Sequence, residues 1–137
     1  MTIRHGSRSL AAYLKRLIKV NGPLTVARYM SEVLNNPNFG YYAVRDPFGV
    51  GGDFTTAPEI SQMFGELIGA WCIDCWQRLG APDPVLLVEL GPGRGTLLSD
   101  LWRSAVVSPD FRSAVRVCLV ESSPVLRGRQ QEQLSRL

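Results

Sequence analysis

The chain has 137 residues, of which 45% are hydrophobic and 20% charged, so it can bury one core as an ordinary soluble globular chain does. Its 15 Lys and Arg and 12 Asp and Glu give a formal net charge of +3 with no dense basic run, which argues against nucleic acid as a partner. No stretch approaches the roughly eighteen apolar residues of a membrane-spanning helix. The three cysteines form an odd set in apolar segments and favour free thiols.

Two amphipathic helices are expected first. Apolar residues recur at helical spacing behind Ser9 until Asn21-Gly22-Pro23, and again behind Thr25 until Asn36-Pro37-Asn38. Ser and Thr are favoured helix N-caps, and Gly and Pro commonly follow helix ends. The basic residues before Glu32 also resemble a mitochondrial transit peptide. We prefer a basic face on the first helix, because the apolar pattern is suited to packing.

The next segment, residues 39–56, is rich in glycine and aromatic residues and predicts loops with at most one short strand. Loops of this composition often line functional sites. Pro58 is well placed to begin a helix whose apolar stripe extends to Leu79, and Gly80 ends it. The pair Cys72 and Cys75 falls within this stripe and has no second pair, so we predict no metal or redox site there.

A βαβ unit is predicted after the connector 81–84. Val85–Leu90 and Val115–Val120 are apolar runs typical of parallel strands covered on both faces, and a helix is expected from near Gly95 to Trp102. A further helix is expected from Pro124. The predicted fold is therefore α/β, with a helical region at 1–81 and the start of a doubly wound, Rossmann-like domain at 82–137.

The turn after the first strand is Glu89-Leu90-Gly91-Pro92-Gly93-Arg94-Gly95-Thr96. Glycines at alternate positions let the backbone approach a bound nucleoside, and the helix N-terminus that follows offers free N–H groups. A dinucleotide fingerprint or a P-loop would need glycine where Thr96 stands, so a nicotinamide oxidoreductase and a P-loop nucleotide enzyme are disfavoured.

The remaining pattern, E-x-G-x-G-x-G, resembles that of class I S-adenosylmethionine-dependent methyltransferases. The resemblance implies S-adenosylmethionine as the cofactor, with Glu89 placing its methionine end. It implies that the turn packs against the cofactor through Gly91, Pro92, Gly93 and Gly95. Glu121 ends the second strand, where a carboxylate can accept both ribose hydroxyls across the carboxyl ends of neighbouring strands.

Longer segments are similar to one family, the bacterial proteins and mitochondrial complex I assembly factors that methylate a protein arginine. These segments are Gly22–Thr25, Pro37–Tyr42, Gly52–Ser61 and Glu121–Pro124. The resemblance implies a protein substrate with an arginine acceptor. Asp53 and Glu59, acids within the third segment, are the expected catalytic carboxylates, because a protonated guanidinium must be oriented and must lose a proton.

This family ordinarily builds a seven-stranded sheet, and only its first two strands are expected here. We therefore expect a truncated reading frame or a fragment with weak activity alone. The alternative is a noncatalytic nucleotide-binding or assembly module that keeps the glycine turn. The expected location is the cytoplasm of a bacterium or the mitochondrial matrix of a eukaryote, and we prefer the bacterium.

Overall fold

The computed structural model describes residues 9–44 and 52–135. The chain forms two compact units, Met1–Asp46 and Pro47–Leu137, and each is described by itself. The second unit contains the two helices between residues 57 and 78 as well as the strands, whereas the predicted division at 81/82 would separate them. That division remains a prediction. Within the described residues, no helix is both long and apolar enough to cross a membrane.

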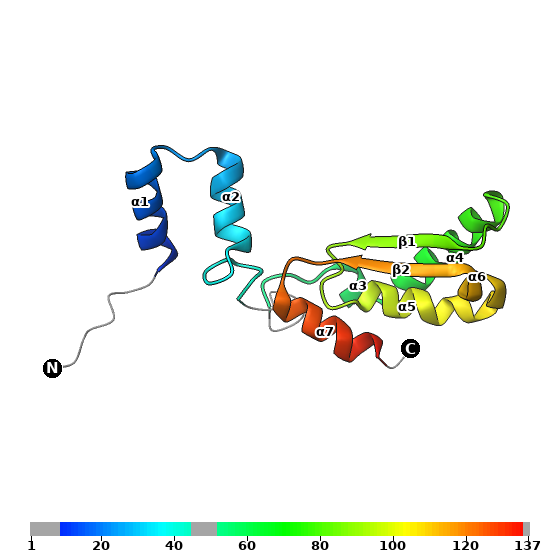
Figure 1. Cartoon of the computed structure of the whole chain (residues 1–137). Helices are drawn as coiled ribbons and strands as arrows, with labels where there is room; N and C mark the ends of the chain where they lie inside the picture. The colour runs from blue at the N-terminus through cyan, green and yellow to red at the C-terminus, as the bar shows by residue number, and fades with distance from the viewer. Residues whose placement is uncertain (1–8, 45–51, 136–137) are drawn as a thin grey trace. The chain divides into compact units, whose positions relative to one another are not determined.

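The first unit contains both predicted N-terminal helices, α1 (Leu10–Asn21) and α2 (Val26–Asn35), which Figure 1 shows in blue and cyan. The predicted caps are confirmed: Ser9 accepts the N–H of Ala12, and Thr25 accepts the N–H of Arg28. These side chains satisfy N–H groups that the first turn of a helix leaves without a partner.

A buried carboxylate fixes the end of α2. The Asn36 side chain donates to Glu32 at 2.8 Å, and Arg28 lies 2.7 Å from the other Glu32 oxygen. The hydrogen bond from Asn36 is the main reason that the pKa of Glu32 is lowered. The Asn36 carbonyl oxygen accepts the N–H of Gly40 at 2.7 Å. The turn after α2 is thereby tied to the helix.

The second unit is built on a parallel pair of strands, β1 (Val85–Leu90) and β2 (Val115–Val120), which lie side by side in Figure 1. Their register runs from Val85 beside Val115 to Leu90 beside Val120. The predicted βαβ unit is confirmed. The other elements are α3 (Ala57–Ile60), α4 (Gln62–Arg78), α5 (Thr96–Ser104), the 3-10 helix η1 (Ala105–Val107), α6 (Pro109–Ala114) and α7 (Pro124–Leu134).

Two local expectations need correction. The single helix expected from Pro58 is interrupted at Ser61, whose backbone is extended and whose hydroxyl accepts the N–H of Met63 at the start of α4. The short helices η1 and α6 were not predicted, because runs this short carry little periodicity. In the described part of the segment 39–56, the structure shows turns and an isolated bridge at Phe54, in keeping with the predicted loops.

The core lies between the helices and one face of the two strands. Its buried side chains are Ile73, Trp76, Ala105, Phe111, Ala114 and Val115. Trp76 and Phe111 meet edge to face with ring centroids 5.6 Å apart. Aromatic pairs favour this arrangement because ring edges are positive and ring faces negative.

The described helices cover only one face of the two strands. Leu86, Val88 and Leu90 on alternate positions of β1 are 65%, 46% and 76% exposed, while the intervening residues are half-buried. The sequence is apolar on both faces of the strand, but the described helices cover only one of them. The second face is therefore open.

Candidate functional site

A turn with left-handed backbone connects β1 to α5. Its three glycines have positive φ angles, 66° at Gly91, 57° at Gly93 and 85° at Gly95. Residues other than glycine rarely adopt such angles. The N–H of Gly91 donates to the Val120 carbonyl oxygen at 2.9 Å, and the N–H of Gly95 donates to the Pro92 oxygen at 2.8 Å. The turn is thus fixed both to itself and to β2.

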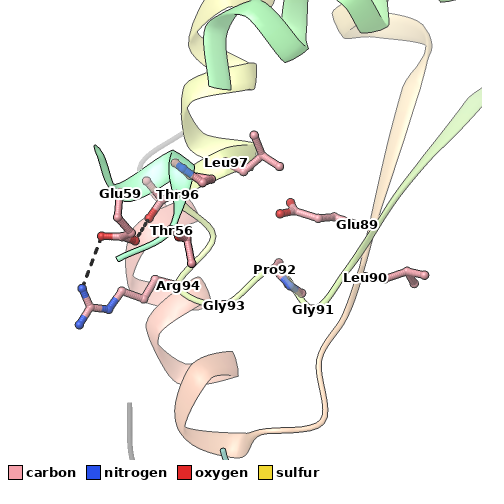
Figure 2. A pocket seen from close by; sticks show the side chains of 11 residues that line it. Thr56, Glu59, Glu89, Leu90, Gly91, Pro92, Gly93, Arg94, Thr96 and Leu97 are labelled. Atoms are coloured by element: carbon pink, nitrogen blue, oxygen red, sulfur yellow. Dashed lines mark hydrogen bonds and ion pairs between the residues drawn. The ribbon is translucent and has the colours of Figure 1, made fainter. Parts of the chain in front are cut away.

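This turn borders a hollow of about 250 Å³ at the carboxyl end of β1, shown in Figure 2. The lining residues come from α3 with the residue before it, from the end of β1 and from the start of α5: Thr56, Pro58, Glu59, Glu89, Leu90, Gly91, Pro92, Gly93, Arg94, Thr96 and Leu97. A Cβ atom at Gly91 would have no heavy atom within 4 Å. The glycine backbone therefore faces open space.

Glu89 supplies a carboxylate to this hollow. It lies on the helix-covered face of β1, and Figure 2 shows its side chain directed across the hollow. Burial raises the pKa of Glu89 above its ordinary value. Because water screens charge poorly at such a half-buried position, a cationic ligand group would interact with this carboxylate more strongly than with one in bulk solvent.

Glu59 supplies a second carboxylate from α3. The Thr96 hydroxyl donates to Glu59 at 2.8 Å, and an Arg94 guanidinium nitrogen lies 3.7 Å from the other carboxylate oxygen. Figure 2 marks both contacts with dashed lines. In the sequence, Thr96 indicated only that dinucleotide and P-loop motifs are absent, and Arg94 carried no signal for a role. A hydrogen bond between residues this far apart in sequence has no periodic signal.

The remaining expected site residues lie outside the hollow. Glu121, at the end of β2, accepts the N–H of Ser123 at 2.8 Å. Gly95 is buried, and a Cβ atom there would lie 3.5 Å from side-chain atoms of Gln130 and Leu134 on α7. Asp53 is exposed and does not line the hollow.

Gln130 is a buried residue that contacts the glycine turn and was not predicted from the sequence. Its side-chain amide donates to the carbonyl oxygen of Gly93 at 2.7 Å. The bond links α7 to the middle of the glycine turn, so β2 and α7 both hold the turn in place. Polar residues on a helix of low overall hydrophobicity give no sequence signal for such a contact.

The residues around the hollow fit the methionine end of S-adenosylmethionine. That end carries an ammonium, a carboxylate and a sulfonium, and the hollow offers the Glu89 and Glu59 carboxylates and the Arg94 guanidinium. The open space beside Gly91 allows a ligand to lie against backbone. A pyrophosphate would instead meet two carboxylates, which disfavours a dinucleotide.

The family model for S-adenosyl-L-methionine-dependent methyltransferases matches residues 67–137, about half of the chain. The chain belongs to this family. A crystal structure from Burkholderia thailandensis, described as a "likely methyl transferase" bound to S-adenosyl-homocysteine, superposes with a TM-score of 0.78 at 30% identity. That alignment covers 93% of this chain and 33% of the other.

Curated relatives share the same region. The "Protein arginine methyltransferase NDUFAF7 homolog, mitochondrial" of Drosophila melanogaster is 49% identical over 129 residues, which are 93% of this chain and 29% of the relative. The human protein arginine methyltransferase NDUFAF7 is 57% identical over 91 residues, or 66% of this chain and 21% of the relative. The chain thus spans less than a third of these relatives. Both are mitochondrial by name and give no support to our bacterial preference.

Proposed function

We propose that the chain forms the S-adenosylmethionine-binding part of a methyltransferase that modifies an arginine side chain of a protein. The observation that carries the proposal is the hollow between the open glycine turn and the half-buried Glu89 carboxyl. Relatives named as protein arginine methyltransferases support the acceptor. Their mitochondrial names favour the mitochondrial matrix over a bacterial cytoplasm.

Each expected cofactor residue has a proposed part. Glu89 accepts hydrogen bonds from the cofactor ammonium, and Gly91, Pro92 and Gly93 give the backbone surface on which the cofactor packs. Gly95 supports the turn from behind, where it faces α7. Glu121 binds the ribose with the carboxylate oxygen that is not held by Ser123. When bound, S-adenosylmethionine would supply an electrophilic methyl for the guanidinium nitrogen, with S-adenosyl-homocysteine as the leaving group.

The chain's own residues would orient the acceptor and take up its proton. A guanidinium is protonated at neutral pH, with a pKa above about 12, so its nitrogen must lose a proton as the new bond forms. Glu59 lines the hollow and is the better placed of the two expected acids. Asp53 does not line it, and its catalytic role remains a prediction.

Binding is tested by titrating S-adenosyl-homocysteine into the purified chain in a calorimeter, with NAD as the control ligand. We expect saturable binding of S-adenosyl-homocysteine alone. Glu121→Ala should weaken that binding by about 1.5–3 kcal/mol, the typical contribution of hydrogen bonds to a charged group. Absence of binding, or equal binding of NAD, would contradict the proposed cofactor.

The noncatalytic alternative is tested by methyl transfer. The protein that carries this chain is incubated with S-adenosylmethionine labelled in its methyl group and with a mitochondrial protein extract. Label on arginine supports the proposed reaction. Cofactor binding without label transfer to any residue would favour the nucleotide-binding assembly module instead.

A further inference from the structure

The contacts around Glu59 connect two segments that border the hollow. We refer to Glu59, Arg94 and Thr96 as the Glu59 cluster. We propose that Thr96 is a positioning residue, whose hydroxyl fixes the Glu59 carboxylate and thereby holds α3 against the glycine turn in the arrangement that binds the cofactor. This inference rests on the proposed function, because it takes the hollow as the cofactor site.

The direction of the Thr96 hydroxyl is the first reason. Thr96 is the first residue of α5. The residue before it, Gly95, has no side chain that could cap the helix. At such a position a threonine hydroxyl commonly bonds within its own helix end. Here it donates to Glu59, which lies 37 positions earlier in the chain. The bond therefore stabilises tertiary structure.

The small size of α3 is the second reason. This helix has four residues, and the Thr56 side chain before it makes no capping bond. An isolated helix of this length is unstable, so its placement depends on contacts with its surroundings. Ile60, at its end, is 72% exposed and adds little packing. The bond from Thr96 is a polar anchor of this segment to the rest of the unit.

Glu59 has two partners, Thr96 and Arg94, and the strength of each contact decides which of them holds its carboxylate in place. The Glu59 side chain is 19% exposed, and its 2.8 Å bond from Thr96 has the geometry of a strong hydrogen bond to a charged acceptor. The ion pair with Arg94 is 3.7 Å long, and the Arg94 side chain is 35% exposed. Partly solvated ion pairs of this kind contribute little to stability. The hydrogen bond from Thr96 should therefore hold the Glu59 carboxylate more strongly than the ion pair with Arg94 does.

The consequence for the hollow is direct. Thr56, Pro58 and Glu59 form its α3 side, and Gly91 to Arg94 form its turn side. If the bond is lost, α3 can move away from the turn, and the cofactor must restore the arrangement at a cost in affinity. Thr96 would thus affect ligand binding through Glu59, without contact to the ligand being required.

The test uses the whole 137-residue chain and calorimetric titration with S-adenosyl-homocysteine. Thr96→Val removes the hydroxyl at nearly constant volume, Thr96→Ser keeps it, and Thr55→Val is the matched control at an exposed threonine nearby. We expect Thr96→Val to weaken binding about tenfold, and Thr96→Ser and Thr55→Val to stay near the original affinity. Glu59→Ala completes a double-mutant cycle with Thr96→Val, in which the two losses should not add.

A second measurement separates this inference from the proposed function. NMR relaxation of the Glu59 and Ile60 amides should show order parameters falling from about 0.85 toward about 0.6 in Thr96→Val, with or without ligand. If the unaltered chain binds no S-adenosyl-homocysteine, the proposed function fails, and these order parameters alone decide whether Thr96 holds α3. Unchanged order parameters, unchanged affinity or additive losses would each overturn the positioning role.

Discussion

Glu89 lies one residue before the end of β1, with its carboxyl partly removed from water. Because burial raises its pKa in the folded chain, ionisation of Glu89 opposes folding. Below the ordinary carboxyl pKa of 4.5 the group is protonated in both folded and unfolded chains, so Glu89 adds no ionisation penalty to folding. The penalty grows as pH rises through that value and is complete above the raised pKa of the folded state.

Glu89→Gln should therefore raise the midpoint of thermal unfolding at neutral pH and leave it unchanged in acid. The same substitution should weaken S-adenosyl-homocysteine binding by about tenfold or more, because the ligand ammonium loses a charged partner. Thermal unfolding across a pH series and calorimetry measure the two effects. A variant that is less stable at neutral pH would show that the carboxylate is satisfied in the free chain.

Gly80, which lies outside the glycine turn, is a matched control for Gly91 within it. Both have positive φ, 66° and 85°, and a Cβ atom at either position would have no heavy atom within 4 Å. Alanine should therefore destabilise the chain by a similar amount at each, about 1 kcal/mol. Only Gly91→Ala should also reduce S-adenosyl-homocysteine affinity, since its methyl would enter the hollow. Equal affinities in the two variants would remove Gly91 from the ligand surface.

At the scale of elements, the packing of α4 on α5 depends on two glycines. A Cβ atom at Gly65 would lie 2.5 Å from the Asp100 Cβ, and one at Gly69 would lie 2.9 Å from the Leu101 carbonyl oxygen and overlap the Ser104 hydroxyl. The helix backbones therefore approach closely only because these side chains are absent. The packing of α5 in turn places Thr96 and the end of the glycine turn.

Gly69→Ala should lower the free energy of unfolding by about 1–3 kcal/mol, because the helices must separate. Gly128→Ala in α7 is the control, since no heavy atom other than the adjacent backbone of its own helix lies within 4 Å of the added methyl. Alanine there should stabilise the chain by roughly 0.5–1 kcal/mol, the usual difference in a helix interior. Denaturant unfolding measures the change in the free energy of unfolding for both variants. A neutral Gly69→Ala would mean that α4 and α5 adjust freely.

The elements with strong local signals were predictable from sequence. Ser9 and Thr25 marked helix starts, and the apolar runs ending at Leu90 and Val120 marked parallel strands. The break at Ser61 was not, because the apolar spacing continues across it. The bond from Thr96 to Glu59 was not predictable either, because a contact between distant segments leaves no period in the sequence.

At the scale of the whole molecule, the second unit presents an open apolar sheet face. Leu86, Val88, Leu90 and Val120 are all well exposed. Contiguous apolar surface of this kind promotes association and binds hydrophobic dyes. The covered face, which includes Leu87, instead packs against the core.

The double substitution Leu86→Thr and Val88→Thr should reduce dye fluorescence and concentration-dependent association without lowering the unfolding midpoint, since threonine suits strands. Leu87→Thr on the covered face should instead lower the free energy of unfolding by roughly 1–3 kcal/mol. Sedimentation and thermal unfolding measure these results. Loss of stability in the double variant would show that the exposed face is packed in solution.

The hydrogen bonds from Gly91 to Val120 and from Gln130 to Gly93 mean that the turn proposed to contact the ligand is complete only when β2 and α7 are both docked. An unfolded chain therefore has no partial site to offer. By mass action, a ligand held by such a site shifts the population toward the folded form, by about 2.7 kcal/mol when its concentration is a hundred times Kd. The supply of methyl donor in the compartment would then govern how much of this chain escapes proteolysis.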